Sequence, residues 1–201
     1  LWNIFGPYPF FFHFFQVTFH IVNAILLFKI FRYWFTMGVA FFLSLIFVVH
    51  PMNVEAVAWI SASGAVLSGL FGLAAFCLLM KKGNTSRETL AAFACLLIAG
   101  LFQETGLLFI LIIFVCKLLF RKDGLILYLV GSAAVIAVYA VLRFGLAHFY
   151  FNNQPSAPIM AMTLSDRILN IPKIILFYFK TFIYPINLGF HQVWTVARSD
   201  W

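Results

Sequence analysis

Long apolar runs separated by short polar breaks dominate this sequence of 201 residues. Hydrophobic residues make up 64% of the chain and charged residues only 9%, whereas an ordinary soluble domain is about 25% charged. A soluble core cannot cover that much apolar surface, so lipid must be the solvent for most of the chain. We therefore predict an all-α, polytopic membrane protein.

The apolar runs predict six membrane spans and a further segment of less certain placement. The six spans cover about residues 10–31, 34–49, 57–80, 89–102, 106–120 and 125–144. The fourth and fifth are near the short limit of about 17 residues for crossing a bilayer, so we expect them to be tilted. Pro172, Lys173 and Lys180 interrupt the last segment, about residues 168–184, which is either a seventh span or an interfacial amphipathic helix.

The chain begins at Leu1, without the basic segment and cleavage site of a signal peptide. Trp2, Tyr8 and two prolines near the start are typical of a loop at the membrane interface. We expect residues 1–201 to form a single membrane-embedded helical domain that is a piece of a longer protein.

Basic residues mark alternate connections between the predicted spans. Eight of the 13 Lys and Arg residues fall in three connections, with Lys29 and Arg32 in the first, Lys81, Lys82 and Arg87 in the second, and Lys117, Arg121 and Lys122 in the third. By the positive-inside rule these connections face the cytoplasm. The other connections then face outward, and they bring His50, Glu55, Glu104, Arg143 and Asp166 to one membrane surface.

A polar island from His50 to Ser68 separates two of the long apolar runs. A carboxylate at this depth, such as that of Glu55, is costly unless it has a partner or a function. Two hypotheses account for the outward cluster. In the first, the acids and Arg143 pair to satisfy helix ends. In the second, His50 and Arg143 hold the phosphate of a lipid-linked substrate, while Glu55 or Glu104 orients or activates a hydroxyl group.

Polar side chains also follow one face of the first predicted span. His13, Gln16, His20 and Asn23 are spaced so that a helix presents them on the same side. One interpretation is a polar seam that forms hydrogen bonds with neighbouring helices. The other is that the outer end of the seam, His13 and Gln16, lines a substrate cavity.

Several stretches of the chain resemble the motifs of one enzyme family, in the same order. They are Phe12-His-Phe-Phe-Gln-Val-Thr-Phe-His-Ile-Val-Asn23, His50-Pro-Met-Asn-Val-Glu-Ala-Val-Ala-Trp59, Phe102-Gln-Glu-Thr-Gly106, Arg143 at a Leu-Arg helix end, Asp166-Arg-Ile-Leu, Phe177-Tyr-Phe-Lys and Tyr184-Pro-Ile-Asn-Leu188. The second stretch resembles the His-Pro-x-x-x-Glu-Ala-Val motif of the transmembrane and tetratricopeptide-repeat O-mannosyltransferase family and its bacterial relatives. The resemblance covers most of the chain.

This resemblance implies the GT-C glycosyltransferase fold in a bacterial plasma membrane or the endoplasmic reticulum. Such enzymes transfer a sugar, such as mannose, from a polyprenyl-phosphate donor to a protein or glycan acceptor on the non-cytoplasmic face, and the lipid-linked donor is a substrate, not a cofactor. In the family an acidic residue of the first external loop is the base. That loop would precede Leu1, and Gln103 stands where the family has Lys. We therefore expect the piece itself to be inactive.

Other chemistries have little support in the sequence. It contains no phosphate-binding glycine loop and no His-Glu-x-x-His motif, and His50 with Glu55 makes a weak ligand pair, so we expect no metal site. The cations are scattered between apolar runs, and the net charge of +7 therefore does not indicate nucleic-acid binding. Two alternatives to a transferase stay open: a transporter or flippase that uses the polar seam as a pathway, and a non-catalytic membrane scaffold.

Overall fold

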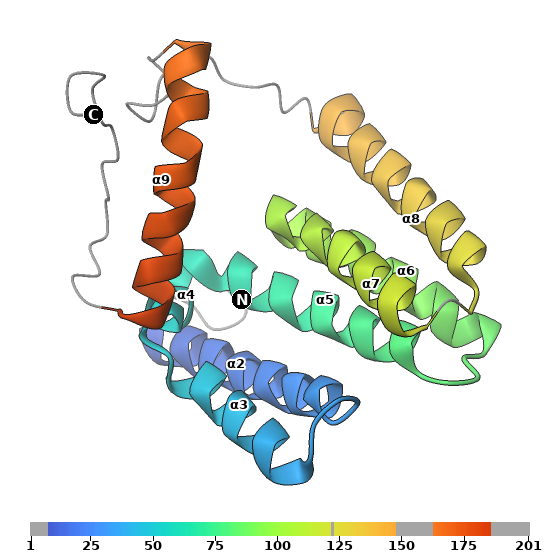
Figure 1. Ribbon diagram of the computed structural model, residues 1–201, viewed down its shortest axis with the longest axis horizontal. Coiled ribbons are helices and arrows are strands. Elements are labelled where there is room, and N and C mark those ends of the chain that lie inside the picture. Colours follow the sequence, from blue (N-terminus) through green and yellow to red (C-terminus); the bar gives the residue numbers. More distant parts are fainter. Residues whose placement is uncertain (1–7, 122, 148–162, 186–201) are drawn as a thin grey trace. The chain divides into compact units, whose positions relative to one another are not determined.

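A computed structural model describes residues 8–121, 123–147 and 163–185. Within these residues the fold is all-α, with eight α-helices and no strand (Figure 1). The chain divides into two compact units, Leu1–Phe149 and Tyr150–Trp201. Parts of three predicted loops, at residues 1–7, 148–162 and 186–201, lie outside the described residues, as does Lys122. The all-α prediction is confirmed.

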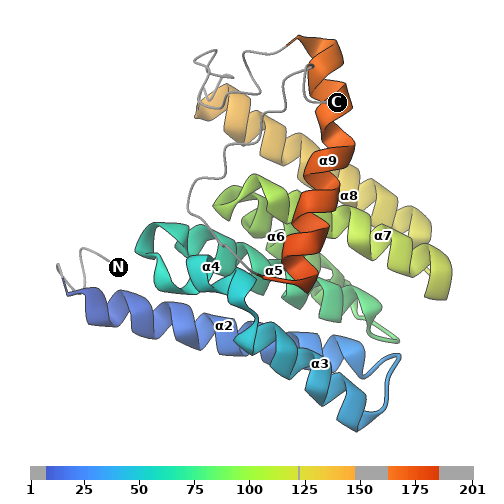
Figure 2. The same cartoon turned by 60° about the vertical axis from the view of Figure 1, so that its left-hand side comes forward.

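Seven of the α-helices belong to the first unit. They are α2 (Pro9–Phe31), α3 (Met37–Val49), α4 (Val54–Ala58), α5 (Ser63–Met80), α6 (Ser86–Phe102), α7 (Leu108–Phe120) and α8 (Leu125–Ala140). Short helical turns of other kinds adjoin them, namely the 3-10 turns Pro51–Asn53, Ile60–Ala62 and Glu104–Leu107 and the π-helical turn Val141–Leu146. Figure 2 shows the short α4 beside α2, between the ends of α3 and α5.

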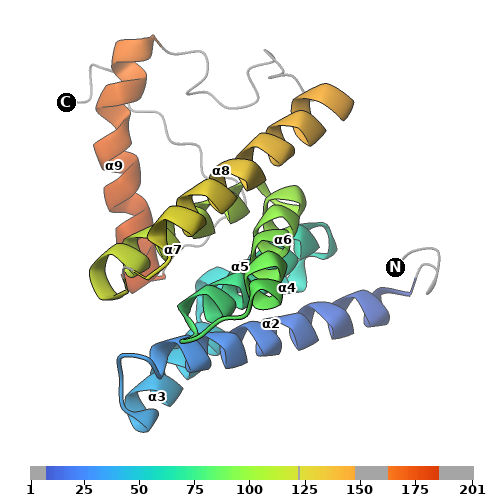
Figure 3. The ribbon, with the colours of Figure 1, turned by 90° about the vertical axis from the view of Figure 1, so that its right-hand side faces the viewer.

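Helix α5 lies between α2 and α6 in the first unit (Figure 3). Its buried side chains Leu73, Phe76 and Leu79 form one apolar cluster with Leu96 of α6 and Ile113 of α7. Because lipid tails are as apolar as these side chains, close packing rather than transfer out of water holds such helices together.

Large apolar side chains cover the outside of the first unit. Phe41 and Phe42 are both 61% exposed, and Ile126 is 80% exposed. Apolar surface of this extent indicates contact with lipid. Three segments are long and apolar enough to cross a membrane, namely Pro9–Phe31, Ile60–Met80 and Leu125–Leu146. The chain is therefore a multi-pass membrane protein.

The sequence predicts six to seven spans, and the described helices provide three or four. The fourth candidate is the pair Met37–Val49 and Pro51–Ala58, which is bent by 48°. Helices α3 and α7 have 13 residues each and α6 has 17. At about 1.5 Å per residue, 13 residues reach about 20 Å, which is less than the roughly 30 Å of a hydrocarbon core. The additional spans stay a prediction.

The start of the third predicted span differs from the structure. The prediction begins this span near Val57, whereas the helix breaks at Trp59, whose backbone is extended with φ −93° and ψ 117°. Helix α5 begins only at Ser63. A side chain of α2, described below, bonds to the Trp59 carbonyl group at this break, and a local apolar pattern cannot reveal this contact.

Helix α9, Leu164–Ile183, is the described part of the second unit. Thr163 is its N-cap, and the Thr163 Oγ1 accepts the backbone N–H of Asp166, in the first turn, at 3.3 Å. The helix has 20 residues but is not among the segments apolar enough to span. Its polar and apolar residues, including Lys173 and Lys180, separate onto different faces, which favours the interfacial alternative over a span.

Candidate functional site: the polar end of the helix unit

The three basic connections lie together at one end of the first unit, on the left in Figure 3. The rings of Trp34, between α2 and α3, and of Phe120, at the end of α7, have centroids 5.3 Å apart. The Arg121 guanidinium, which follows α7, donates a hydrogen bond of 2.6 Å to the carbonyl oxygen of Met80, at the end of α5. We call this the basic end. Lys and Arg residues of alternate connections thus gather at one end of the unit, as the positive-inside rule requires.

The opposite end, which we call the polar end, holds the island around α4 and the turn before α7. The Ser68 hydroxyl donates to the Ala99 carbonyl oxygen at 2.9 Å and so joins α5 to α6. Gly106 of the turn lies directly against this contact, because a Cβ atom there would be 2.4 Å from both oxygens. Only glycine lets the turn approach so closely, and this approach fixes the position of the neighbouring Glu104.

Glu104 and Arg143 form an ion pair at the polar end. Arg143 lies in the π-helical turn Val141–Leu146 after α8, and π-helical turns occur frequently at functional sites. The side chain of Glu104 is 63% exposed and that of Arg143 is 32% exposed. Because an exposed pair contributes about 0–1 kcal/mol, either partner can be given up to an incoming ligand at small cost.

His50 and Asn53 shape the backbone where α3 ends. The His50 Nδ1 accepts the backbone N–H of Met52 at 3.2 Å, so in the neutral ring Nε2 carries the proton and is a donor. The Asn53 amide donates to the carbonyl oxygen of Phe47 at 2.7 Å, which satisfies one of the free carbonyl groups at the end of a helix. Glu55, on α4, is exposed, and its carboxylate forms no hydrogen bond or ion pair with the described residues.

Gln16 of α2 bonds to the broken backbone that follows α4. Its Nε2 donates to the carbonyl oxygen of Trp59 at 2.8 Å and lies 3.4 Å from that of Ala56. The Gln16 side chain is buried. Non-helical backbone is tolerated at membrane depth only when its polar groups find partners in the protein, and Gln16 supplies one of them, beside the Ala62 backbone N–H that donates to the Trp59 carbonyl oxygen at 2.9 Å.

Two further side chains of α2 continue the same seam. His20 Nε2 is 3.3 Å from the carbonyl oxygen of Val48 in α3, and the Asn23 amide donates to that of Val66 in α5 at 3.0 Å. Both side chains are buried. The polar-seam interpretation is therefore confirmed for the three side chains that make these bonds. His13 is half-buried one turn before Gln16 on the same helix, and a substrate role for these two residues stays a prediction.

The structure thus brings Glu104 and Arg143 into contact and leaves the Glu55 carboxylate outside this pair. In the described part of the chain, no three His, Cys, Asp or Glu side chains gather in a way that could hold a metal ion. Comparison of the chain with protein-family models, with curated proteins and with solved structures finds no match.

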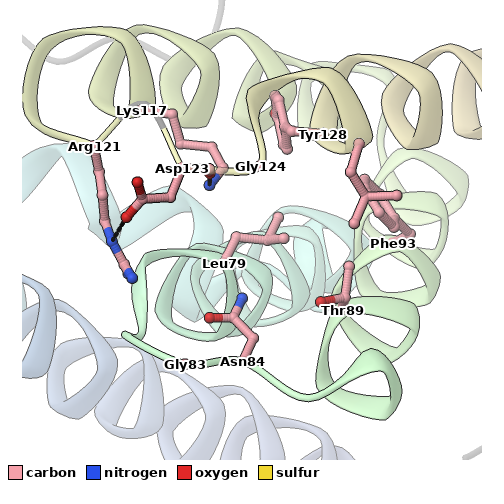
Figure 4. A pocket seen from close by; sticks show the side chains of 11 residues that line it. Leu79, Gly83, Asn84, Thr89, Phe93, Lys117, Arg121, Asp123, Gly124 and Tyr128 are labelled. Carbon is pink, nitrogen blue, oxygen red and sulfur yellow. Dashed lines mark hydrogen bonds and ion pairs between the residues drawn. The ribbon is translucent and has the colours of Figure 1, made fainter.

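A cavity at the basic end is not predicted by the sequence. It is lined by Lys117 and Arg121, which the sequence pattern presents only as topology signals (Figure 4). One signal was available: Lys117 lies inside an apolar helix, three residues before its end, where a charge is costly. The cavity forms because the connection between α5 and α6 meets the connection between α7 and α8. A local sequence pattern does not encode such a meeting.

Proposed function

We propose that this chain is the core of a membrane glycosyltransferase of the GT-C type. It transfers a sugar, such as mannose, from a polyprenyl-phosphate donor to a protein or glycan acceptor on the non-cytoplasmic face. The observation that supports this proposal is the exposed contact between Glu104 and Arg143, at the end opposite the basic connections. Six to seven spans, and a bacterial plasma membrane or the endoplasmic reticulum as location, belong to the same proposal.

The proposed roles follow from the chemistry of the side chains. A guanidinium binds phosphate oxygens through two parallel hydrogen bonds, so Arg143 holds the donor phosphate, with His50 Nε2 as a second donor. A carboxylate accepts a proton, so Glu104 or Glu55 orients or deprotonates the acceptor hydroxyl. The bond from the sugar to the phosphate oxygen breaks, a bond to the acceptor oxygen forms, and the hydroxyl proton passes to the carboxylate.

Gln16 and His13 have supporting roles in this proposal. Gln16 holds the island backbone through the Trp59 carbonyl group, so it positions the segment that carries Glu55. His13 lies toward the outer end of the same helix, where a neutral or protonated imidazole can donate a hydrogen bond to the sugar or the phosphate.

The test measures sugar transfer in membranes that contain the full-length protein, with a labelled polyprenyl-phosphate mannose donor. We expect Glu104→Gln and Arg143→Gln to lower the rate by about 100-fold or more, the range expected when a positioned acid–base or phosphate-binding group is lost. Glu88→Gln makes the same change at the basic end and should leave the rate unaltered. Full activity of both Glu104→Gln and Glu55→Gln would remove these acids from the mechanism.

A non-catalytic membrane scaffold is the second candidate, since charged side chains at helix ends also pair for structural reasons. Under this alternative the protein copurifies with a partner protein and binds no polyprenyl phosphate. The transporter or flippase alternative loses support, because Gln16, His20 and Asn23 donate to backbone carbonyl groups instead of lining an open pathway. Substrate uptake by proteoliposomes without transferase activity would favour the transporter or flippase alternative again.

A further inference from the structure

The cavity at the basic end has a volume of about 260 Å³. At about 30 Å³ per water molecule, this space equals roughly nine waters, which is enough for a phosphate group. The connection between α5 and α6 forms one wall, and the end of α7 with the start of α8 forms the other. Figure 4 shows the side chains of Lys117, Asn84 and Thr89 around this space.

Lys117 is a buried cation that forms no ion pair with a carboxylate of the described residues. The residue is only 6% exposed. Its Nζ donates to the carbonyl oxygen of Asp123 at 3.0 Å and lies 6.0 Å from the centre of the Tyr128 ring. An ammonium group has three donors, and no carboxylate of the described residues forms an ion pair with this one. Buried charges in membrane proteins normally pair, so the cavity beside Lys117 is short of a negative charge.

Arg121 adds a second positive group to the same cavity. One guanidinium nitrogen bonds to Met80, and Nε is 3.8 Å from the carboxylate of Asp123. The Asp123 side chain is 87% exposed and therefore well screened by water. Two cations and one exposed anion leave the cavity with a net charge of about +1.

The remaining walls are apolar and continue onto the lipid-facing surface. Leu79 and Phe93 line the cavity, together with Leu127 of α8, which is exposed. The neighbouring Ile126 and Val130 are exposed as well. A ligand that fits this combination has an anionic head and an apolar body. The positive-inside rule assigns this end to the cytoplasmic leaflet, where anionic lipids are enriched.

We propose that this cavity binds the phosphate group of an anionic phospholipid from the cytoplasmic leaflet. Lys117 and Arg121 contact the phosphate oxygens, and the acyl chains leave along the exposed apolar surface of α8. Basic pockets between membrane helices on the cytoplasmic side bind lipid headgroups by this chemistry. The site is at the end opposite Glu104 and Arg143, so the proposal does not depend on the transferase function.

Native mass spectrometry of the purified, delipidated full-length protein tests this proposal. The protein is titrated separately with phosphatidylglycerol, phosphatidylcholine and inorganic phosphate. We expect one tightly bound phosphatidylglycerol, with an affinity about tenfold higher than that for phosphatidylcholine, since each basic group near an anionic lipid contributes appreciably. Lys117→Met should abolish this preference. Lys29→Met makes the same substitution on an exposed lysine at the same end and should preserve it.

Thr89→Glu is a second variant, which places a carboxylate at the cavity and should also abolish the preference. Thermal unfolding in neutral detergent shows whether each variant is folded, and Lys117→Met should be at least as stable as the wild type because it removes a buried charge. Equal binding of both lipids, or undiminished binding of phosphatidylglycerol by both cavity variants, overturns the proposal. Binding of inorganic phosphate that is lost in Lys117→Met, without a preference for phosphatidylglycerol over phosphatidylcholine, would assign the cavity to a free anion and overturn the lipid source.

Discussion

The two ends of the unit formed by α2 to α8 are built in different ways. At the basic end, local devices start two of the helices: Thr85 and Glu88 form a capping box at the start of α6, and Gly124 precedes α8 with φ 64°, while Arg121 adds one long-range bond to the Met80 carbonyl oxygen. At the polar end, a helix breaks at Trp59, and the Trp59 carbonyl oxygen accepts the Gln16 amide from a distant part of the chain as well as the Ala62 backbone N–H.

The two ends should therefore respond differently to substitution. Local caps depend on a few adjacent residues, so a substitution in one of them affects a single helix end. At the polar end three helices depend on the side chains of α2, so a substitution there should affect the whole unit. Irregular backbone at membrane depth occurs where protein or a water-filled cavity surrounds it, which is the usual setting of substrate sites in membrane proteins.

The largest difference between the ends should appear when a methyl group is added to a glycine. In Gly106→Ala the new Cβ atom would be 2.4 Å from the Ala99 and Ser68 oxygens, and the Ala99 backbone cannot yield without moving α6. We expect the unfolding free energy to fall by about 3 kcal/mol. The measurement is unfolding in mixed micelles, followed by circular dichroism.

The matched control for that variant is Gly38→Ala, in the first turn of α3. No atom lies within 4 Å of the added Cβ atom there. Alanine is the better helix former, so we expect unchanged stability or a gain of up to about 1 kcal/mol. Equal losses in the two variants would show that the polar end is no more tightly packed than the rest.

An intermediate effect is expected for Gln16→Leu, which removes one of two donors to the Trp59 carbonyl group. The carbonyl oxygen keeps the Ala62 backbone N–H at 2.9 Å, so the variant loses one hydrogen bond between segments, and we expect a loss of about 0.5–1.5 kcal/mol. Thr18→Val on the same helix removes only a bond to the preceding turn, from Oγ1 to the Phe14 carbonyl oxygen, and should cost less than about 0.5 kcal/mol. Similar small losses for both variants would argue against the role assigned to Gln16.

The smallest effect concerns the capping box at the basic end. A hydrogen bond from Lys81, followed by one from the backbone N–H of Thr85, lowers the pKa of Glu88 from 4.5 to about 2. A lowered pKa means that the ionised carboxylate stabilises the folded state above pH 4.5 and that this contribution is lost as the pH falls toward 2. We expect hydrogen-exchange protection of the first turn of α6 to decline over this interval.

Glu88→Gln should abolish that pH dependence, because the neutral amide does not titrate in this interval. The amides around Trp59, at the polar end, should keep constant protection over the same pH interval, since the Trp59 N–H donates to the backbone carbonyl oxygen of Glu55, which does not titrate. A decline of equal size at both ends would mean that they unfold together, which would contradict the distinction between local caps and long-range contacts.

The first span and its seam could be predicted because their signals are local. The apolar run over residues 10–31 has the length of a membrane helix, and α2 covers Pro9–Phe31. His20 and Asn23 repeat at helical spacing within it, and both bond to neighbouring helices. The grouping of the basic connections at one end could also be predicted, because the positive-inside rule depends only on which loops carry Lys and Arg.

The break at Trp59 could not be predicted from the sequence. Apolar residues continue through this region, and the partner that stabilises the break, Gln16, is 43 residues away. One of the two hypotheses predicted that Arg143 pairs with the acids of this surface but not which acid it contacts, because the π-helical turn that carries Arg143 has no local sequence signal. The environment of Lys117 likewise depends on two connections that meet in space.

The central claim is that the polar end and the basic end lie at opposite membrane surfaces. Single cysteines at Gln103 and at Ser86, in a background without Cys77, Cys95 and Cys116, report on these ends. In sealed membranes of known orientation, a membrane-impermeant maleimide should label Gln103→Cys from the non-cytoplasmic side and Ser86→Cys only from the cytoplasmic side. Labelling of both cysteines from the same side would contradict the account.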